Sequence, residues 1–217
     1  TLTADRMDLV GSLQATGGAA QLNTATAGWG VDLGSATDVA ANALELSDAE
    51  LDRITAAGLL VVSSRADLTL SSAISPSGVA SLSLLAEGAL LDGNASGADV
   101  TVATLAMDAT SVGAFGNRLE TAASNLSARA RAGGVYVIDS DGLTLSSASS
   151  TGAGTFVTAQ GPLTVTGNVT ASGNQIDLAA LGNGSMLRVG AGAAVSGSSV
   201  TLTADRMDLV GSLQATG

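Results

Sequence analysis

The sequence predicts an all-β parallel solenoid, in which short strands stack coil upon coil around one hydrophobic core. Apolar and polar residues alternate over short runs that are separated by Gly, Asn, Asp and Ser, which is the pattern of half-buried strands and tight turns. Residues 1–17 and 201–217 are identical at every position. A long fixed period of this kind is typical of solenoids and tandem arrays, in which each unit packs only against its neighbours.

The two identical segments define a repeat unit that spans residues 1–200. So long a run of identities does not arise between unrelated parts of one globular domain. We therefore expect residues 1–217 to form a single continuous solenoid, with residues 1–200 as one full unit and residues 201–217 as the first coil of the next. We also expect the sequence to be a piece of a much longer tandem array.

The alternation places the strands and the core. Leucine dominates the inward positions, since the chain has only 2% aromatic residues and its core must be built from Ala, Val, Leu and Ile. The clearest strand runs are residues 67–70, 81–84, 135–138, 143–145, 162–165, 175–178 and 201–203. The side chains predicted to be buried include Leu68, Leu70, Leu82, Leu84, Leu143 and Leu145.

Spacing between the runs indicates the length of a coil. The interval from Leu82 to Val102 is the same as the interval from Leu143 to Leu163. Coils of about 20 residues account for both intervals and would give about ten coils in each unit. A β-sandwich or a barrel would also show short strands and turns, but neither requires an exact long repeat.

One stretch departs from the strand pattern and predicts a helix. Ser47 has the position of a helix N-cap, and Glu50, three residues later, completes a capping box. Leu46 and Leu51 are placed as a hydrophobic staple across the same turn. A short helical excursion is therefore predicted near residues 48–57.

The end and the faces of this helix are also predicted. Gly58 suits a left-handed C-terminal stop. A cover for apolar surface is a simpler interpretation of the excursion than a binding role. The side chains expected to face the coils are Leu51 and Ile54, and those expected to face water are Asp48, Asp52 and Arg53.

Composition excludes several classes of function. The formal charge is −11, and the eight basic residues are all Arg, which disfavours nucleic acid and anionic membrane surfaces. No apolar run approaches the roughly 18 residues of a membrane-spanning helix. The absence of His, Lys and Cys removes the commonest general base, the Schiff-base amine, disulfides and Cys metal sites. We therefore predict no catalytic residues, no cofactor and no metal site.

Three short stretches have to be compared with this prediction. The run Asp139–Gly142 resembles the start of a calcium loop, but the bidentate Glu of such a loop would fall at Ser150, so a turn is the better interpretation. Gly28–Gly30 and Gly190–Gly192 lack the third Gly of a dinucleotide-binding loop and are also interpreted as turns.

Longer stretches resemble a known family. The runs GVDLG (Gly30–Gly34) and LSDAELDRITA (Leu46–Ala56) resemble a segment that recurs in filamentous-haemagglutinin-like exoproteins. The run LTVTGNVTA (Leu163–Ala171), followed by Ile176–Leu178, is similar to the coils of the same family. The resemblance covers most of the chain, and Leu46–Ala56 is its most specific part. It implies a right-handed parallel β-helix in a very large bacterial protein that is secreted or bound to the cell surface, often an adhesin.

These observations together predict a structural role. The chain is expected to be a repeat of an extracellular fibre or adhesin stalk whose partners are adjacent identical repeats, other copies of the filament or a cell-surface ligand. A glycan-binding or host-protein-binding face is the first alternative, and a row of exposed aromatic side chains would favour it. Trp29, Tyr136 and Phe156 look too scattered to form one. A polysaccharide-degrading enzyme is the second alternative, which a convergent cluster of Asp and Arg in a groove would favour.

Overall fold

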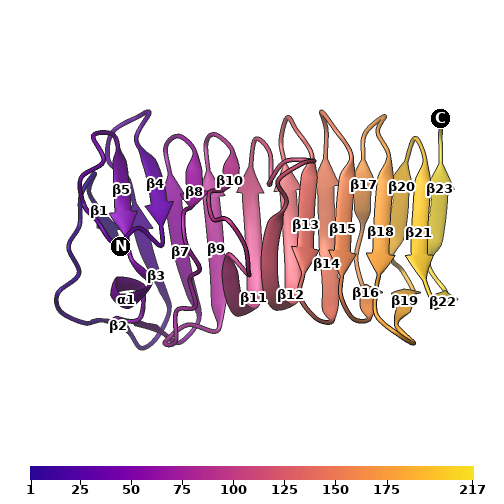
Figure 1. Ribbon diagram of the computed structural model, residues 1–217, viewed down its shortest axis with the longest axis horizontal. Coiled ribbons are helices and arrows are strands. Elements are labelled where there is room, and N and C mark those ends of the chain that lie inside the picture. The colour runs from indigo at the N-terminus through magenta and orange to yellow at the C-terminus, as the bar shows by residue number, and fades with distance from the viewer.

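The chain folds into a parallel β-solenoid, as the sequence predicts. The computed structural model describes residues 1–217, and Figure 1 shows the chain winding through successive coils whose strands lie across the long axis. Every pairing between the named strands is parallel. The predicted fold class is therefore confirmed. No helix in the structure has the length and apolar character needed to cross a bilayer.

Three ladders of strands form the sides of the solenoid, which we call A, B and C. Side A is a ladder of ten strands, one from each coil. In order from the N-terminal end it contains β1 (Leu2–Thr3), β3 (Ala19–Asn23), β7 (Leu59–Ser64), β9 (Ser81–Ala86), the second halves of β11 (Val100–Ala109), β12 (Leu119–Ala130) and β14 (Leu143–Ser150), then β17 (Val169–Ala171), β20 (Ala194–Gly197) and β23 (Ser212–Ala215).

Side B follows side A in each coil. Val112 joins its two halves through two isolated bridges, one to Leu90 and one to Val135. Its strands, in spatial order, are β5 (Ala43–Leu46), β4 (Gly30–Leu33), β8 (Leu68–Leu70), β10 (Leu90–Asp92), β13 (Val135–Asp139), β15 (Thr155–Ala159), β18 (Ile176–Ala180) and β21 (Val200–Ala204).

Side C completes each coil. In the middle of the solenoid it is formed by the long strands β11, β12 and β14, which continue around a corner into side A. Strand β12 begins even earlier, on side B, where its first three residues pair with β13. The separate strands of side C are β2 (Leu13–Ala15) and β6 (Ile54–Ala56) at the N-terminal end, and β16 (Leu163–Val165), β19 (Met186–Val189) and β22 (Arg206–Leu209) at the C-terminal end.

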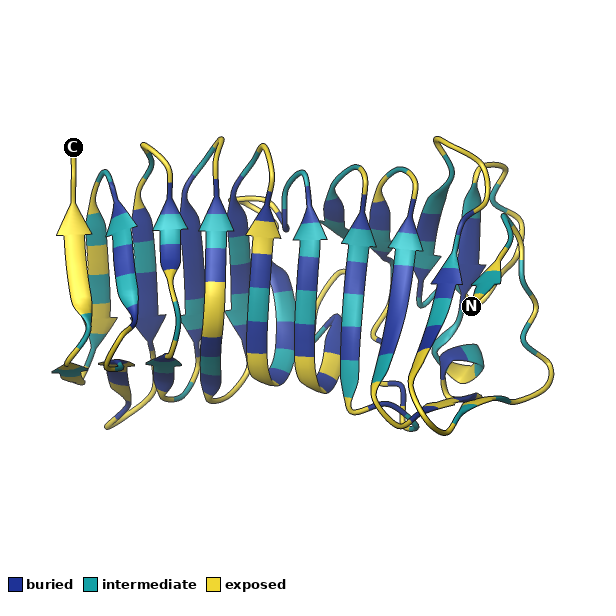
Figure 2. Cartoon of the chain, turned by 180° about the vertical axis from the view of Figure 1, so that it is seen from behind, coloured by how far each residue is buried: buried dark blue, intermediate teal, exposed yellow.

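One core of 48 buried residues runs through all the coils. Apolar side chains stack on equivalent rungs, so that Val62, Leu84, Met107, Ala128 and Ala148 follow one another along side A. Figure 2 shows the resulting alternation of buried and less buried positions along the strands. The burial prediction is confirmed for all of its leucines, which are no more than 2% exposed: Leu68, Leu70, Leu82, Leu84, Leu143 and Leu145.

The coil length is close to the prediction, although one of the two intervals used to estimate it does not join paired residues. Leu143 pairs with Leu163 of the next coil, as expected. Leu82 instead pairs with Leu105, not with Val102. Strand β11 bends around a corner, and apolar and polar residues alternate both before and after the bend. Its hydrophobic pattern alone therefore does not determine which of its residues lies above Leu82.

The predicted helix exists and is shorter than expected. Helix α1 spans Asp48–Leu51, and Ser47 and Glu50 form the predicted capping box. Residues 54–56 belong to strand β6 instead, because they pair with β2 and join the ladder of side C. The predicted C-terminal stop at Gly58 is consequently wrong, since this residue lies in the short connection before β7.

The faces of this segment agree with the prediction, with one exception. Leu51 and Ile54 are fully buried. Asp52 and Arg53 are exposed, whereas Asp48 is half-buried. The Oδ1 atom of Asp48 accepts a hydrogen bond of 2.6 Å from the backbone N–H of Ser75, which holds this carboxylate against the next coil.

Candidate functional site

The repeated segment lies at the two ends of the solenoid, in two different settings. The second copy forms a complete coil, in which β21, β22 and β23 stack on β18, β19 and β20 of the preceding coil. The first copy forms β1 and β2, which pair with β3 and β6 of the coil that follows. Identical residues therefore use opposite strand edges at the two ends. Leu2 is paired with Leu22, for example, while its twin Leu202 is paired with Leu178.

One aspartate of the repeat, Asp5 in the first copy and Asp205 in the second, also bonds in opposite directions in the two copies. In the first copy, Asp5 Oδ1 accepts the backbone N–H groups of Ala25 and Thr26, each at 2.8 Å, and Oδ2 accepts the Thr26 hydroxyl at 2.6 Å. The hydroxyl and amide bonds from Thr26 lower the pKa of Asp5. In the second copy, Asp205 Oδ2 accepts the Gly184 N–H at 2.7 Å. One copy thus bonds forward along the chain, and the other bonds backward.

The C-terminal end of the solenoid is an open face. All four residues of β23 are exposed, and Figure 2 shows this strand uncovered over its whole length beside the C-terminus. Apolar side chains that an inner coil would bury are here in contact with water. Met207, Leu209 and Leu213 pair with the fully buried residues Leu187, Val189 and Val195 of the preceding coil, yet each is more than 40% exposed.

The N-terminal end is covered. Residues 34–53 fold back so that β5 pairs with the outer edge of β4, and Figure 1 shows β5 and α1 at this end. A polar loop closes over β5, because the buried carboxylate of Glu45 accepts hydrogen bonds from Ser35 Oγ at 2.7 Å and from the Ala40 N–H at 2.5 Å. Glu50 extends the cover by accepting the Leu9 N–H at 3.1 Å.

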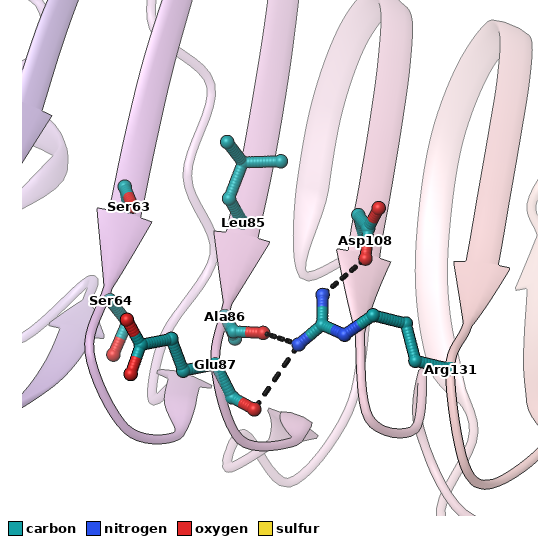
Figure 3. Close-up of a pocket in the computed structure, with 7 residues that line it drawn as sticks. All are labelled: Ser63, Ser64, Leu85, Ala86, Glu87, Asp108 and Arg131. Atoms are coloured by element: carbon teal, nitrogen blue, oxygen red, sulfur yellow. Dashed lines mark hydrogen bonds and ion pairs between the residues drawn. The ribbon is translucent and has the colours of Figure 1, made fainter. Parts of the chain in front are cut away.

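Acidic and basic side chains do converge in one surface hollow, on the rim of side A (Figure 3). Arg131 reaches back across two coils to Asp108 and to the carbonyl oxygens of Ala86, at 2.5 Å, and Glu87, at 3.1 Å. Arg129 binds the other oxygen of Asp108 at 3.3 Å. Both carboxylate oxygens of Asp108 are therefore paired, and the cluster braces adjacent coils.

The aromatic side chains are less scattered than predicted. Tyr136 and Phe156 occupy paired rungs of β13 and β15 and stack with ring centroids 5.3 Å apart. Phe115, which was not among the predicted aromatic positions, packs edge-on against both rings. Arg118 lies over the rings of Phe115 and Phe156 at about 6 Å. Trp29 is not part of this cluster. The prediction of scattered aromatics is therefore wrong for the pair Tyr136 and Phe156.

Carboxylates gather at two places on the corner between sides B and C. Asp139 is buried, and its oxygens accept hydrogen bonds from the Thr121 hydroxyl and the backbone N–H groups of Ala123 and Asp141. These bonds agree with the interpretation of Asp139–Gly142 as a turn. Oxygens of Asp92, Asp99 and Glu120 form a second group, and all lie within 4.8 Å of one another. The sequence does not predict this group, because Glu120 belongs to the next coil.

The repeat is visible in the sequence, but the difference between its two settings is not. Which edge each copy presents depends on the coil that lies next to it, and identical residues contain no such information. The signal that was available for the acidic group is the run Asp92–Gly97, in which oxygen-bearing side chains alternate.

No protein-family model, curated protein or solved structure matches this chain.

Proposed function

We propose that this chain is a structural repeat of an extracellular bacterial fibre or adhesin stalk, in which units stack end to end into one continuous solenoid. The observation that carries the proposal is that the two copies of the repeat use opposite strand edges. The strands of the first copy pair only with β3 and β6, and the strands of the second pair only with β18, β19 and β20. When the two copies are superimposed, their strand pairings together give both sides of a joint between units.

Backbone hydrogen bonds support this joint atom by atom. In the first copy, the N–H of Leu13 donates to the carbonyl of Arg53 at 3.0 Å, in the following coil. In the second copy, the N–H groups of Ser212 and Thr216 donate to the preceding coil. The N–H of Leu213 is then the equivalent group that would face an added unit. Asp205 would likewise accept bonds from both neighbouring coils at once, as the two copies do separately.

Burial of the open face supplies the driving force. Apolar area removed from water stabilises association by about 25 cal/mol per Å². Met207, Leu209 and Leu213 would be covered by an added coil, as their rung partners Leu187, Val189 and Val195 are covered by the last one. The unpaired strand edges would be satisfied in the same step. End-to-end stacking therefore relieves both sources of instability at this end.

One segment of the repeat has a different secondary structure in its two copies. In the second copy, residues 206–209 form β22. In the first copy, residues 6–9 form no strand, because β5 already occupies the outer edge of β4. In a joined array, β22 and the β5 of the next unit would compete for that edge. We infer that β5, α1 and the loop closed by Glu45 form a cap that an incoming unit displaces.

The bacterial and extracellular parts of the proposal rest on the resemblance to filamentous-haemagglutinin-like exoproteins. The stacking part rests on the joint alone. The proposal assigns no reaction to the chain. The two parts can be tested separately, because stacking requires only purified protein.

The test of stacking is a substitution at the open edge. Leu213→Pro removes the outward N–H without removing a hydrogen bond within the chain, whereas Leu213→Thr keeps that N–H and serves as the matched control. Sedimentation across a concentration series should show end-to-end oligomers for the parent and the Thr variant, and should show monomers for the Pro variant. Monomers in all three cases, in a chain of correct fold, would contradict the proposal.

A second candidate function is favoured by the aromatic cluster. Phe115 is 64% exposed above Tyr136, and a hollow of about 400 Å³ beside it includes the amide side chains of Asn174 and Gln175. Exposed aromatic rings with nearby amides suit the stacking and hydrogen bonding of a sugar ring. A panel of neutral oligosaccharides tests this candidate. Binding that is lost in Phe115→Ala would support it, and no binding to the parent chain would exclude it for that panel.

A further inference from the structure

Three carboxylates from two adjacent coils converge at the corner between sides B and C. Asp92 ends β10, Asp99 directly precedes β11, and Glu120 is the second residue of β12 in the next coil. Their oxygens all lie within 4.8 Å of one another. The structure contains no other group of three acidic side chains this close. Close contact between like charges is unfavourable unless a cation or a proton lies between them.

The burial of Asp99 provides an independent sign of a missing partner. This residue is fully buried. One oxygen, Oδ2, accepts the backbone N–H of Glu120 at 2.8 Å, whereas Oδ1 is enclosed and has no hydrogen-bond partner. A buried carboxylate oxygen without a partner is costly. None of the ion pairs in the structure involves the three carboxylates, so no arginine supplies the missing positive charge.

We propose that Asp92, Asp99 and Glu120 bind one Ca²⁺ ion that links two adjacent coils. The loop between the first two residues has the spacing of the first half of a calcium-binding loop, in which oxygen ligands at alternate positions are followed by Gly. Asp92, Asn94 and Ser96 alternate in this way and precede Gly97, which has a φ of 90°.

The second half of that loop pattern is missing from the local sequence. The twelfth position, where such a loop carries a bidentate Glu, is Ala103. The solenoid supplies a Glu from the next coil instead, because the backbone N–H of Asp99 donates to the Glu120 carbonyl at 2.7 Å and thereby sets the two residues side by side. Stacking of coils thus completes a site that a single loop leaves unfinished.

The ligand set favours Ca²⁺ over Mg²⁺, because Ca²⁺ accepts several protein carboxylates in a flexible arrangement. Oxygen ligands lie about 2.3–2.6 Å from Ca²⁺, so two ligands on opposite sides of the ion are separated by about 4.6–5.2 Å. Three oxygens that all lie within 4.8 Å of one another can therefore reach one Ca²⁺ ion. Mg²⁺ needs about 2.0–2.1 Å and near-octahedral geometry, and it keeps several of its waters. Asp92 and Glu120 are half-exposed, which leaves an open side for water ligands.

The alternative occupant of the cluster is a proton. Burial, with the charges of Asp92 and Glu120 adding to its effect, raises the pKa of Asp99 to about 7. Burial and the charge of Asp92 also raise the pKa of Glu120. A proton held between Asp99 and Asp92 would relieve the same repulsion and would need no metal. The two occupants differ in their response to added Ca²⁺.

The experiment is a calcium titration of the chelator-treated chain by isothermal calorimetry, paired with thermal unfolding in Ca²⁺, Mg²⁺ and chelator. The variants are Asp99→Asn and Glu120→Gln, and the control is Asp38→Asn, at an exposed carboxylate outside the cluster. We expect one Ca²⁺ per chain and a Tm that rises with Ca²⁺ concentration for the parent and the control. Affinity should fall at least tenfold in either cluster variant.

Two results would overturn the proposal. If the parent shows no saturable binding, or if the cluster variants bind as tightly as the control, the three carboxylates do not hold Ca²⁺ and the shared proton is the better account. Equal binding of Mg²⁺ would overturn the choice of ion. Glu120→Gln keeps the test decisive if Asp99→Asn does not fold, since Glu120 is only half-buried.

Discussion

At the scale of single residues, the fold depends on inward aliphatic side chains that stack on equivalent rungs. Leu145 is fully buried between Leu126 and Val165, and each of these three residues is paired with the next along the ladder. Neighbouring rungs are held at a fixed spacing by the backbone ladder. A cavity at one rung therefore cannot collapse easily.

Leu145→Ala should cost about 2–5 kcal/mol of unfolding free energy, because the lost contacts add to the cost of the cavity. Leu181→Ala is the matched control, since Leu181 is 39% exposed and its truncation should change the free energy by less than about 0.5 kcal/mol. Denaturant unfolding of both variants measures the difference. Equal effects would show that the buried rungs do not behave as a packed core.

Asp139 predicts a pH dependence whose sign follows from its burial. Burial raises the pKa of this carboxyl above its usual value of 3.8. The folded state therefore favours the protonated form, and the stability that Asp139 contributes is complete below about pH 3.8 and is lost as the pH rises through the raised pKa. Asp139→Asn removes this loss, so the unfolding midpoint of the variant should fall less than that of the parent from about pH 4 to about pH 7. If the unfolding midpoints of the parent and the variant change with pH in parallel, the raised pKa of Asp139 does not affect stability and the prediction is wrong.

At the scale of elements, the sequence determined the type of structure better than the pairing. The strand alternation and the capping box at Ser47 were both visible, because they depend on neighbours two to four residues away. The end of the helix was not, because residues 54–56 are extended by their ladder with β2, which belongs to the first copy of the repeat. The acidic group around Asp99 was missed for the same reason, since its third member comes from another coil.

The short helix can be tested through its cap. Ser47 Oγ accepts the Glu50 N–H, and the Glu50 carboxylate accepts the Ser47 N–H at 2.9 Å. Ser47→Ala should therefore cost about 0.5–2 kcal/mol locally. Hydrogen exchange should speed up at Leu9 and over residues 48–53 while the inner coils keep their protection. Uniform loss of protection along the chain would show that the cap supports the whole solenoid.

At the scale of the whole molecule, the repeat unit is not a whole number of turns. Along side A, eight steps lead from β1 to β20, and the second copy then begins with β21 on side B. Consecutive units would therefore advance by eight coils and one side, which is about 40 Å at about 4.8 Å per coil. This is shorter than ten coils, because the fold-back at residues 34–53 consumes chain without lengthening the stack. The aromatic and acidic clusters would wind around a fibre instead of lining one side.

The central claim is that units join as one continuous solenoid, and comparing chains of one, two and three tandem units tests it most directly. Stability in a one-dimensional stack rises with the number of units, because each joint adds interface while the number of free ends stays at two. Denaturation midpoints should therefore rise from one unit to three, each with a single cooperative transition. Equal midpoints in all three chains would show that the units are independent beads, and the continuous-fibre account would be wrong.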